Sequence, residues 1–332
     1  MQGSMFLRSA YSEVGESHLF WGKDCEDTVV TGENSDTGVS ACVVSDGAGS
    51  YQYAKDGSEI TAHTALQKLL TDFDNLYKLP REQLGEVMLS AVRVPLIERA
   101  MELGCGLEEL SATLVCAAMA ADGRYLYFHV GDGVIAACDM NGECRIISQY
   151  YHEIAPNFTT FVTIEDTPFN AGKGRGGVAA FLLTSDGPEM IMTSENGWMT
   201  AQAELLLQMG IFFPPHRMED EFRKLTYYYK ELGMYDDASF AIISDRRYAP
   251  YVFDGMDESL RNLIFLFPER IPRRVTRQIL DCFLLLAAHP EGVTEKQMTR
   301  ALHTHRNWNT FHKLLGLLTT DAIRLHEGRY YF

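Results

Sequence analysis

Residues 112–148, ATLVCAAMAADGRYLYFHVGDGVIAACDMNGECRIIS, indicate the fold class of this 332-residue chain most clearly. Runs of strand-forming residues lie there on both sides of Gly131-Asp132-Gly133 and of Asn141-Gly142. Asn-Gly and Asp-Gly between β-forming residues are typical of hairpins, so we predict antiparallel strands joined by these turns. The strands are expected at residues 112–120, 124–130, 134–139 and 144–148.

Further strands and helices are expected on both sides of this segment. Residues 39–44, 178–184 and 238–244 are apolar at successive positions, which indicates strands covered on both faces. Helical periodicity occurs in residues 58–70, 81–101, 198–209 and 218–232. Because the strands come in hairpin clusters and the helices in blocks, the sequence favours an antiparallel α+β sandwich over a doubly wound parallel sheet.

The charge is negative overall and unevenly distributed. The chain has 45 Asp and Glu against 29 Lys and Arg, a formal net charge of −16. This balance excludes a uniformly basic nucleic-acid-binding chain, because Lys and Arg are the residues that bind phosphates. Residues 268–332 hold ten basic and six acidic residues, whereas the part before them holds 19 and 39. We therefore predict an acidic body over 1–250, a linker over 251–267 and a mildly basic C-terminal domain over 268–332.

The cysteines and the N-terminus indicate the cellular compartment. The seven cysteines form no CxxC pair, and several lie in apolar runs, as Cys42 and Cys116 do. Reduced thiols are therefore expected, rather than a disulfide framework or a zinc site. The first residues, Met-Gln-Gly-Ser-Met, lack the regions of a signal peptide, and no apolar run reaches the roughly 18 residues of a membrane span. We expect a soluble, cytoplasmic protein without a membrane partner.

Three acidic turns at strand ends are the first candidates for chemistry. They are Val-Val-Ser-Asp46-Gly47, Leu-Leu-Thr-Ser-Asp186-Gly187 and Tyr-Asp236-Asp237. Carboxylates at the ends of buried strands can converge on one edge of a sheet, and ligand sets made only of oxygen suit Mg²⁺ or Mn²⁺. Asp-Gly also occurs at residues 56, 122, 132 and 254, and a single such pair is usually only a turn. The ordered set, with Glu26 and Asp27 ahead of the first turn, is what favours a metal site.

Seven short motifs occur in order along the acidic body. They are HLFWGKDCED at residues 18–27, VSDGAG at 44–49, LSATLV at 110–115, FHVGDG at 128–133, APNFTTF at 155–161, LTSDG at 183–187 and YDDAS at 235–239. In this order they resemble the motifs of the metal-dependent protein phosphatases of the 2C type, most closely their divergent bacterial branch. Each motif is weak alone, and the specificity of the resemblance comes from their order.

The resemblance implies a fold and a metal centre. The fold would be a four-layer αββα sandwich of two antiparallel sheets flanked by helices, with two Mn²⁺ or Mg²⁺ ions at one edge. By motif match, Asp46 would contact both ions, and the carbonyl of Gly47 would bind one of them. Asp186 and Asp236 would hold the other ion. Asp46, Asp186 and Asp236 are therefore the predicted catalytic residues.

The remaining acidic residues receive indirect roles from the same resemblance. Glu26 and Asp27 would bind metal through water. Asp237, at a position that is often Asn in the family, is expected to contact a metal-binding residue rather than a metal ion. Asp132 is a candidate for a similar supporting role or for a third ion.

The family's activity implies hydrolysis of phosphoserine and phosphothreonine in a phosphoprotein substrate, with a cognate Ser/Thr kinase as the opposing enzyme. Two adjacent ions lower the pKa of a shared water, so a metal-bridged hydroxide can attack phosphorus in line. The ions also neutralise the phosphoryl charge, so the reaction requires no covalent enzyme intermediate.

The chain departs from the family pattern at three positions. Gly22 stands where the family often has a phosphate-binding arginine, and His18 and Lys23 are the candidates to replace it, although lysine lacks the bidentate fork of arginine. Ala48 stands where animal members have a histidine proposed as general acid. Residues 148–152 lack the aspartate of the family's Asp-His motif, the usual ligand of a third ion. The alternative is therefore a pseudophosphatase, a scaffold that binds phosphoproteins without turnover.

The glycine-rich stretch at residues 172–177, Gly-Lys-Gly-Arg-Gly-Gly, invites comparison with a phosphate-binding loop. It lacks the GxxxxGK[ST] pattern and precedes a strand rather than a helix, which excludes a P-loop. We expect a mobile connection that can lend Lys173 or Arg175 to a substrate.

The C-terminal part is predicted to be a winged-helix-like domain of three helices and a hairpin. Helical spacing occurs over 274–288, after Thr294 and over 311–318, and two short strands are expected around Glu327-Gly328. Such domains often bind DNA through the third helix. Candidate contacts there are Arg306, Trp308, Asn309, His312 and Lys313. The small positive balance beside an acidic body favours docking of a protein over DNA, and a DNA-tethered regulator is the alternative.

Overall fold

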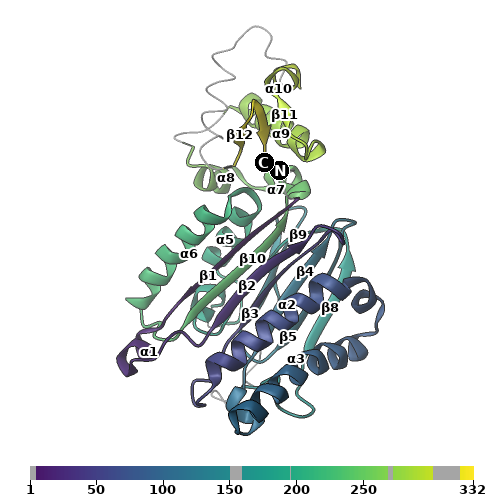
Figure 1. The fold of residues 1–332 in the computed structure, drawn as a ribbon. Helices are drawn as coiled ribbons and strands as arrows, with labels where there is room; N and C mark the ends of the chain where they lie inside the picture. Colours follow the sequence, from purple (N-terminus) through teal and green to yellow (C-terminus); the bar gives the residue numbers. More distant parts are fainter. Residues whose placement is uncertain (1–4, 150–158, 195, 268–271, 302–321) are drawn as a thin grey trace.

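Two five-stranded antiparallel sheets pack against each other in the centre of the molecule (Figure 1). The structure, a computed structural model, describes residues 5–149, 159–194, 196–267, 272–301 and 322–332. One sheet has the order β2 (Thr28–Asn34), β3 (Val39–Ser45), β4 (Leu114–Ala120), β5 (Arg124–Val130), β8 (Asn170–Arg175). The other has the order β1 (Phe6–Glu13), β10 (Ala238–Asp245), β9 (Val178–Thr184), β6 (Val134–Asp139), β7 (Cys144–Gln149).

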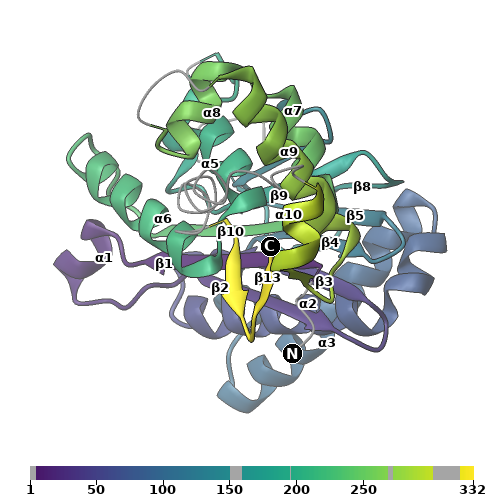
Figure 2. The ribbon, with the colours of Figure 1, turned by 90° about the horizontal axis from the view of Figure 1, so that it is seen from above.

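Helices cover the outer face of each sheet. The α2 (Ala54–Lys78) and α3 (Arg81–Leu103) helices lie on the first sheet, and α5 (Ala201–Phe212) and α6 (Pro215–Lys230) lie on the second. Figure 2 shows these helical layers on opposite sides of the strands. The predicted α+β architecture of two antiparallel sheets flanked by helices is therefore confirmed.

Strand β3 shows why its sequence is apolar at successive positions. Every residue of β3 is buried. Val39, Ala41 and Val43 pack in the cluster formed with α2 and α3, whereas Cys42 and Val44 pack in the cluster between the sheets. Because successive side chains of a strand point to opposite faces, a strand covered on both faces needs apolar residues throughout.

One of the two predicted hairpins is confirmed, and the other is wrong. Strands β6 and β7 pair across Asn141-Gly142 as predicted, and β4 and β5 form a further hairpin across Asp122-Gly123. Strands β5 and β6 belong to different sheets, because β8 pairs with β5 while β9 and β7 pair with β6. Gly131 and Gly133 have φ of 91° and 100°, which lets the chain turn sharply from one sheet into the other. Asp132 therefore lies at the crossover between the sheets.

Residues 172–175 of the glycine-rich stretch lie in β8, so they form a strand and not the mobile connection that we predicted. In the β5–β8 pair, Tyr125 lies opposite Gly174 and Tyr127 opposite Gly172. A Cβ atom on Gly172 would lie 2.5 Å from the Tyr127 ring, so the absence of a side chain makes room for the tyrosine. Lys173 Nζ donates to the carbonyl of Leu79 (2.6 Å) and is thus held at the end of α2.

Short elements complete the body and place its loops. They are α1 (Glu16–Trp21), η1 (Leu107–Leu110), α4 (Glu189–Met192) and η2 (Arg246–Tyr248). Strands β1 and β2, at the start of the chain, were not predicted. Among the described residues, no helix combines the length and the apolar character needed to cross a membrane.

The C-terminal elements share a core with the body. They are α7 (Ala249–Gly255), α8 (Glu258–Ile264), α9 (Arg273–Ala288), β11 (Val293–Thr294), α10 (Glu295–Ala301), β12 (Arg324–His326) and β13 (Arg329–Tyr331). Residues 251–267, predicted as a linker, hold α8 and most of α7, and the Phe253 and Phe265 rings contact Phe283 of α9 with centroids 5.2 and 6.0 Å apart. The β12–β13 hairpin lies where it was predicted. The predicted third helix, with Arg306 to Lys313, lies outside the described residues.

Candidate metal centre

Three aspartates from different strand ends converge at one edge of the sandwich. Asp46 follows β3, Asp186 follows β9, and Asp132 lies in the crossover from β5 to β6. One carboxylate oxygen from each of the three lies within 4.8 Å of those from the other two. The structure thus brings together two of the three predicted catalytic residues and adds Asp132 to them.

Hydrogen bonds to the neighbouring strand fix the position of Asp46. The Asp46 N–H donates to Thr113 Oγ1 (2.9 Å), and the Thr113 N–H donates to the Asp46 carbonyl (2.8 Å). The Ala48 N–H donates to the carbonyl of Ser111 (2.9 Å), so that Gly47 pairs with Ala112 in an isolated β-bridge. This bridge holds the Asp46-Gly47 turn beside the other carboxylates.

Asp27 is a buried carboxylate beside the same cluster. Its side chain accepts a hydrogen bond from Ser185 Oγ at Oδ2 (2.7 Å), and Lys55 Nζ donates to its carbonyl (2.8 Å). Its other oxygen, Oδ1, is buried, and no hydrogen-bond donor reaches it from the described part of the chain. A buried carboxylate oxygen without a donor is costly, and a nearby cation would relieve this cost.

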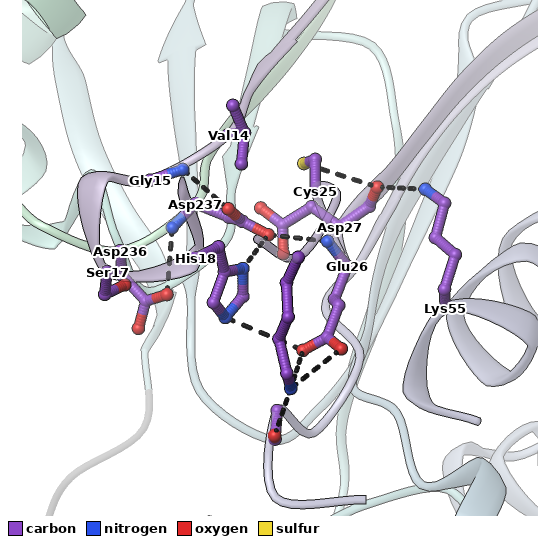
Figure 3. A network of polar contacts seen from close by, with 12 residues as sticks. Val14, Gly15, Ser17, His18, Cys25, Glu26, Asp27, Lys55, Asp236 and Asp237 are labelled. Atoms are coloured by element: carbon purple, nitrogen blue, oxygen red, sulfur yellow. Dashed lines mark hydrogen bonds and ion pairs between the residues drawn. The ribbon is translucent and has the colours of Figure 1, made fainter. Parts of the chain in front are cut away.

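A second polar group surrounds His18, as Figure 3 shows. His18 Nδ1 lies 2.9 Å from Asp237 Oδ2, and His18 Nε2 lies 3.6 Å from Glu26 Oε2. Asp237 is buried and accepts the backbone N–H of Gly15 (2.7 Å) and of Glu26 (2.6 Å). Asp237 therefore hydrogen-bonds two other segments of the chain, Gly15 before α1 and Glu26 before β2. Its role toward a metal ion stays a prediction.

Asp236 and Lys23 lie at the exposed rim of the site. Asp236 is exposed, and one ligand atom each from His18, Asp236 and Asp237 lie within 4.8 Å of one another. Lys23 Nζ lies 3.2 Å from Glu26 Oε1 and donates to the carbonyl of Gly49 (2.8 Å). Both candidate phosphate-binding residues, His18 and Lys23, thus contact Glu26.

The electrostatics of the cluster favour a bound cation. Burial, together with the charges of Asp27 and Asp186, raises the pKa of Asp46 well above its ordinary range. Burial and the charges of Asp132 and Asp236 do the same to the pKa of Asp186, and burial raises the pKa of Asp27. Carboxylate oxygens that repel one another suit a hard divalent ion such as Mg²⁺ or Mn²⁺, so the residues present fit the metal centre that the motifs imply.

The sequence profile of the family described as Protein phosphatase 2C matches residues 14–212, more than half of the chain. The chain belongs to the protein phosphatase 2C family. The matched residues include Glu26, Asp27, Asp46, Asp132 and Asp186. No curated protein matches the chain.

Solved structures of three bacterial phosphatases share the protein phosphatase 2C fold with this chain. A bacterial serine phosphatase has 16% identity and a TM-score of 0.51, covering 72% of this chain and 97% of its own. The S. agalactiae serine/threonine phosphatase has 17% identity and a TM-score of 0.51, covering 72% and 99%. A serine/threonine phosphatase from Staphylococcus aureus has 16% identity and a TM-score of 0.51, covering 73% and 96%. At these identities, the likeness establishes the fold.

Three residues that position the carboxylates of this phosphatase-family site were not predicted from the sequence. Thr113 holds Asp46, and Ser185 holds Asp27. His129 is buried, with Nε2 3.2 Å from the Asp132 carbonyl and Nδ1 2.7 Å from Ser148 Oγ. Burial lowers the pKa of His129 from its usual 6.5 to about 4, so the ring is neutral. These three residues lie inside or beside the quoted motifs, but only their spatial partners distinguish them from ordinary strand residues.

Proposed function

We propose that this chain hydrolyses phosphoserine and phosphothreonine in proteins, in a reaction that depends on Mn²⁺ or Mg²⁺. The observation that carries the proposal is the convergence of Asp46, Asp132 and Asp186 within 4.8 Å in a member of the protein phosphatase 2C family. The substrate would be a phosphoprotein, and a Ser/Thr kinase would be the enzyme that opposes this one.

Each carboxylate would have a defined task in binding two ions. Asp46, the Gly47 carbonyl, Asp186 and Asp236 would hold the ions directly, whereas Glu26 and Asp27 would hold bound water. When bound, the ions would lower the pKa of a water molecule and neutralise the charge of the phosphoryl group.

The residues around this acidic set would orient both the ligands and the substrate phosphate. Asp237 keeps Glu26 and His18 in place through its contacts with the Glu26 N–H and His18 Nδ1. Lys23, whose ammonium group reaches Glu26 and the Gly49 carbonyl, would offer a positive charge to the phosphate. Asp132 would support Asp46 and Asp186 or contribute to a third ion.

We further propose that the C-terminal elements form a winged-helix-like module that docks a protein or regulates the enzyme. The order α9, β11, α10 followed by the β12–β13 hairpin supports this, as does the sheet order β11-β13-β12. The net positive charge of residues 268–332 is small and lies beside an acidic body, which supports protein docking over DNA binding. A gel-shift assay with the full-length chain tests this choice, because steep salt-dependent DNA binding would contradict it.

Hydrolysis of p-nitrophenyl phosphate with and without Mn²⁺ tests the catalytic proposal. We expect Mn²⁺-dependent hydrolysis by the wild type and a loss of about 100-fold or more in Asp46→Asn and Asp186→Asn, the scale for removing one strong electrostatic contact. Asp254→Asn, in an exposed Asp-Gly pair on α7, is the matched control and should keep wild-type activity. A wild-type protein that binds Mn²⁺ without turnover would contradict the proposal and favour a pseudophosphatase.

A further inference from the structure

Helix α1 exposes three consecutive large apolar side chains, which we call the α1 patch. Leu19, Phe20 and Trp21 are 58%, 80% and 76% exposed. The Phe20 and Trp21 rings contact each other edge-on, with centroids 5.1 Å apart. Single exposed apolar residues are common, but adjacent exposed aromatic side chains mark interaction surfaces.

Contacts of its first residues hold α1 in place. The Ser17 N–H and Ser17 Oγ both donate to the carbonyl of Tyr235, at 3.0 and 2.8 Å. The Gly15 N–H donates to Asp237 Oδ1, and a Cβ atom at Gly15 would lie 2.3 Å from the backbone carbon of Asp236. The patch is therefore presented by a positioned helix, which reduces the entropy that binding must overcome.

The same helix connects the α1 patch to the candidate metal centre. His18 lies immediately before the patch, and its ring is turned toward Asp237 and Glu26 (Figure 3). Lys23 follows the patch by two residues and contacts Glu26 and Gly49. Figures 1 and 2 both place α1 at the periphery of the molecule. The exposed patch therefore lies between two residues of the chain, His18 and Lys23, that contact the acidic residues.

The charge of the chain indicates what kind of contact the α1 patch supplies to a phosphoprotein. The protein has a formal net charge of −16, and a phosphorylated residue adds about −1.5 to −2 to its own segment at neutral pH. Long-range electrostatics therefore oppose the approach of a phosphoprotein, apart from the local effect of bound ions. Burial of apolar side chains on the patch supplies affinity that this repulsion does not remove.

We propose that the α1 patch binds an apolar or aromatic side chain that flanks the phosphorylated residue of the substrate. This inference rests on the proposed function and refines it: the preferred substrates are phosphoprotein segments with an apolar residue near the phosphoserine or phosphothreonine.

Two phosphothreonine peptides of equal length and charge, one with Leu and Phe flanks and one with Ser flanks, provide the test. The full-length wild type should have a KM at least about fivefold lower for the apolar peptide, since burying one large apolar side chain has effects of this size or greater. Trp21→Ala and Phe20→Ala should raise that KM toward the value for the Ser-flanked peptide. Their kcat and their hydrolysis of p-nitrophenyl phosphate should stay unchanged, as expected for loss of uniform binding. Tyr251→Ala, which removes a half-exposed aromatic side chain of α7 at the other end of the molecule in Figure 1, is the matched control.

Equal KM values of the wild type for the two peptides would overturn the inference. So would variants that lose self-association while their peptide KM is unchanged, because the patch would then bind a second copy of the chain. Fluorescence anisotropy of both peptides with the same proteins separates this inference from the proposed function. Binding that depends on Trp21 without turnover contradicts only the proposed function, whereas binding that is insensitive to Trp21 and Phe20 contradicts the α1 patch.

Discussion

Replacing Asp46 by Asn should stabilise the metal-free protein, although it should abolish catalysis. The reason is that Asp46, Asp132 and Asp186 each place one carboxylate oxygen within 4.8 Å of those of the other two, where ionised carboxylates repel. Burial and neighbouring charges raise the pKa of Asp46 well above its ordinary range. The metal-free folded state then binds protons more tightly than the unfolded chain, so its stability falls as the pH rises from the ordinary carboxyl range toward neutrality. Asp46→Asn removes this loss.

The magnitude follows from Coulomb's law. Two unit charges 4.8 Å apart repel by about 3.5 kcal/mol at an effective dielectric constant of about 20. Partial protonation and solvent screening of these half-buried carboxyls reduce the net effect, and we expect a gain of about 1–2 kcal/mol at neutral pH. This gain corresponds to a melting temperature higher by a few degrees in a chain of this size, at about 2–4 °C per kcal/mol for slightly shorter proteins.

Thermal unfolding followed by circular dichroism, in chelator and in Mn²⁺, measures both parts of the prediction. In wild type, Mn²⁺ at about 100 times its dissociation constant should add about 2.7 kcal/mol of stability, and Asp46→Asn should lose most of this gain. Asp254→Asn, outside the cluster, should change neither the stability of the metal-free protein nor the stability gained from Mn²⁺. A metal-free Asp46→Asn protein less stable than wild type, or one that Mn²⁺ stabilises as strongly, would refute the reasoning.

Other perturbations test the surrounding structure. Because the folded state lowers the pKa of His129 to about 4, the contribution of this residue to the free energy of unfolding should fall by about 3 kcal/mol as the pH falls from 6.5 through 4. In urea unfolding, wild type should therefore lose about this much more stability over that range than His129→Gln does. The same pH dependence of the free energy of unfolding in wild type and in His129→Gln would contradict a buried, neutral His129 ring. Gly172→Val should lower the melting temperature, with a cost of about 1–3 kcal/mol, because its side chain meets the Tyr127 ring, and a neutral effect would argue against the β5–β8 register. Phe283→Ala, which removes a fully buried ring, should cost about 3–5 kcal/mol in denaturant unfolding, with body and C-terminal elements unfolding in one transition. Two separate transitions would contradict the shared core.

Local sequence signals predicted the strands that are apolar throughout, such as β3, because burial on both faces leaves a direct trace in composition. They failed where pairing depends on distant partners. The Gly131-Asp132-Gly133 turn has the composition of a hairpin, yet β5 pairs with β8 and β6 with β9, which lie later in the chain. Likewise, β8 is a strand because its glycines meet the tyrosines of β5, and its own sequence resembles a loop.

The candidate site also combines residues that the local sequence predicts with contacts that depend on distant parts of the chain. The acidic residues at strand ends were predictable because their residue type and order carry the chemistry. The contact of His18 with Asp237, separated by more than 200 residues, has no signal in either segment alone. The positions of Thr113 and Ser185 beside the carboxylates are also properties of the folded chain, and their hydroxyl groups resemble those of ordinary strand residues.

Phosphate release from a phosphothreonine peptide by the full-length wild type, measured in EDTA and after Mn²⁺ is added back, tests the central claim most directly. We expect no release above background in EDTA and sustained release once Mn²⁺ is restored. Equal release in EDTA and in Mn²⁺, or no release in either, would contradict a metal-dependent protein phosphatase.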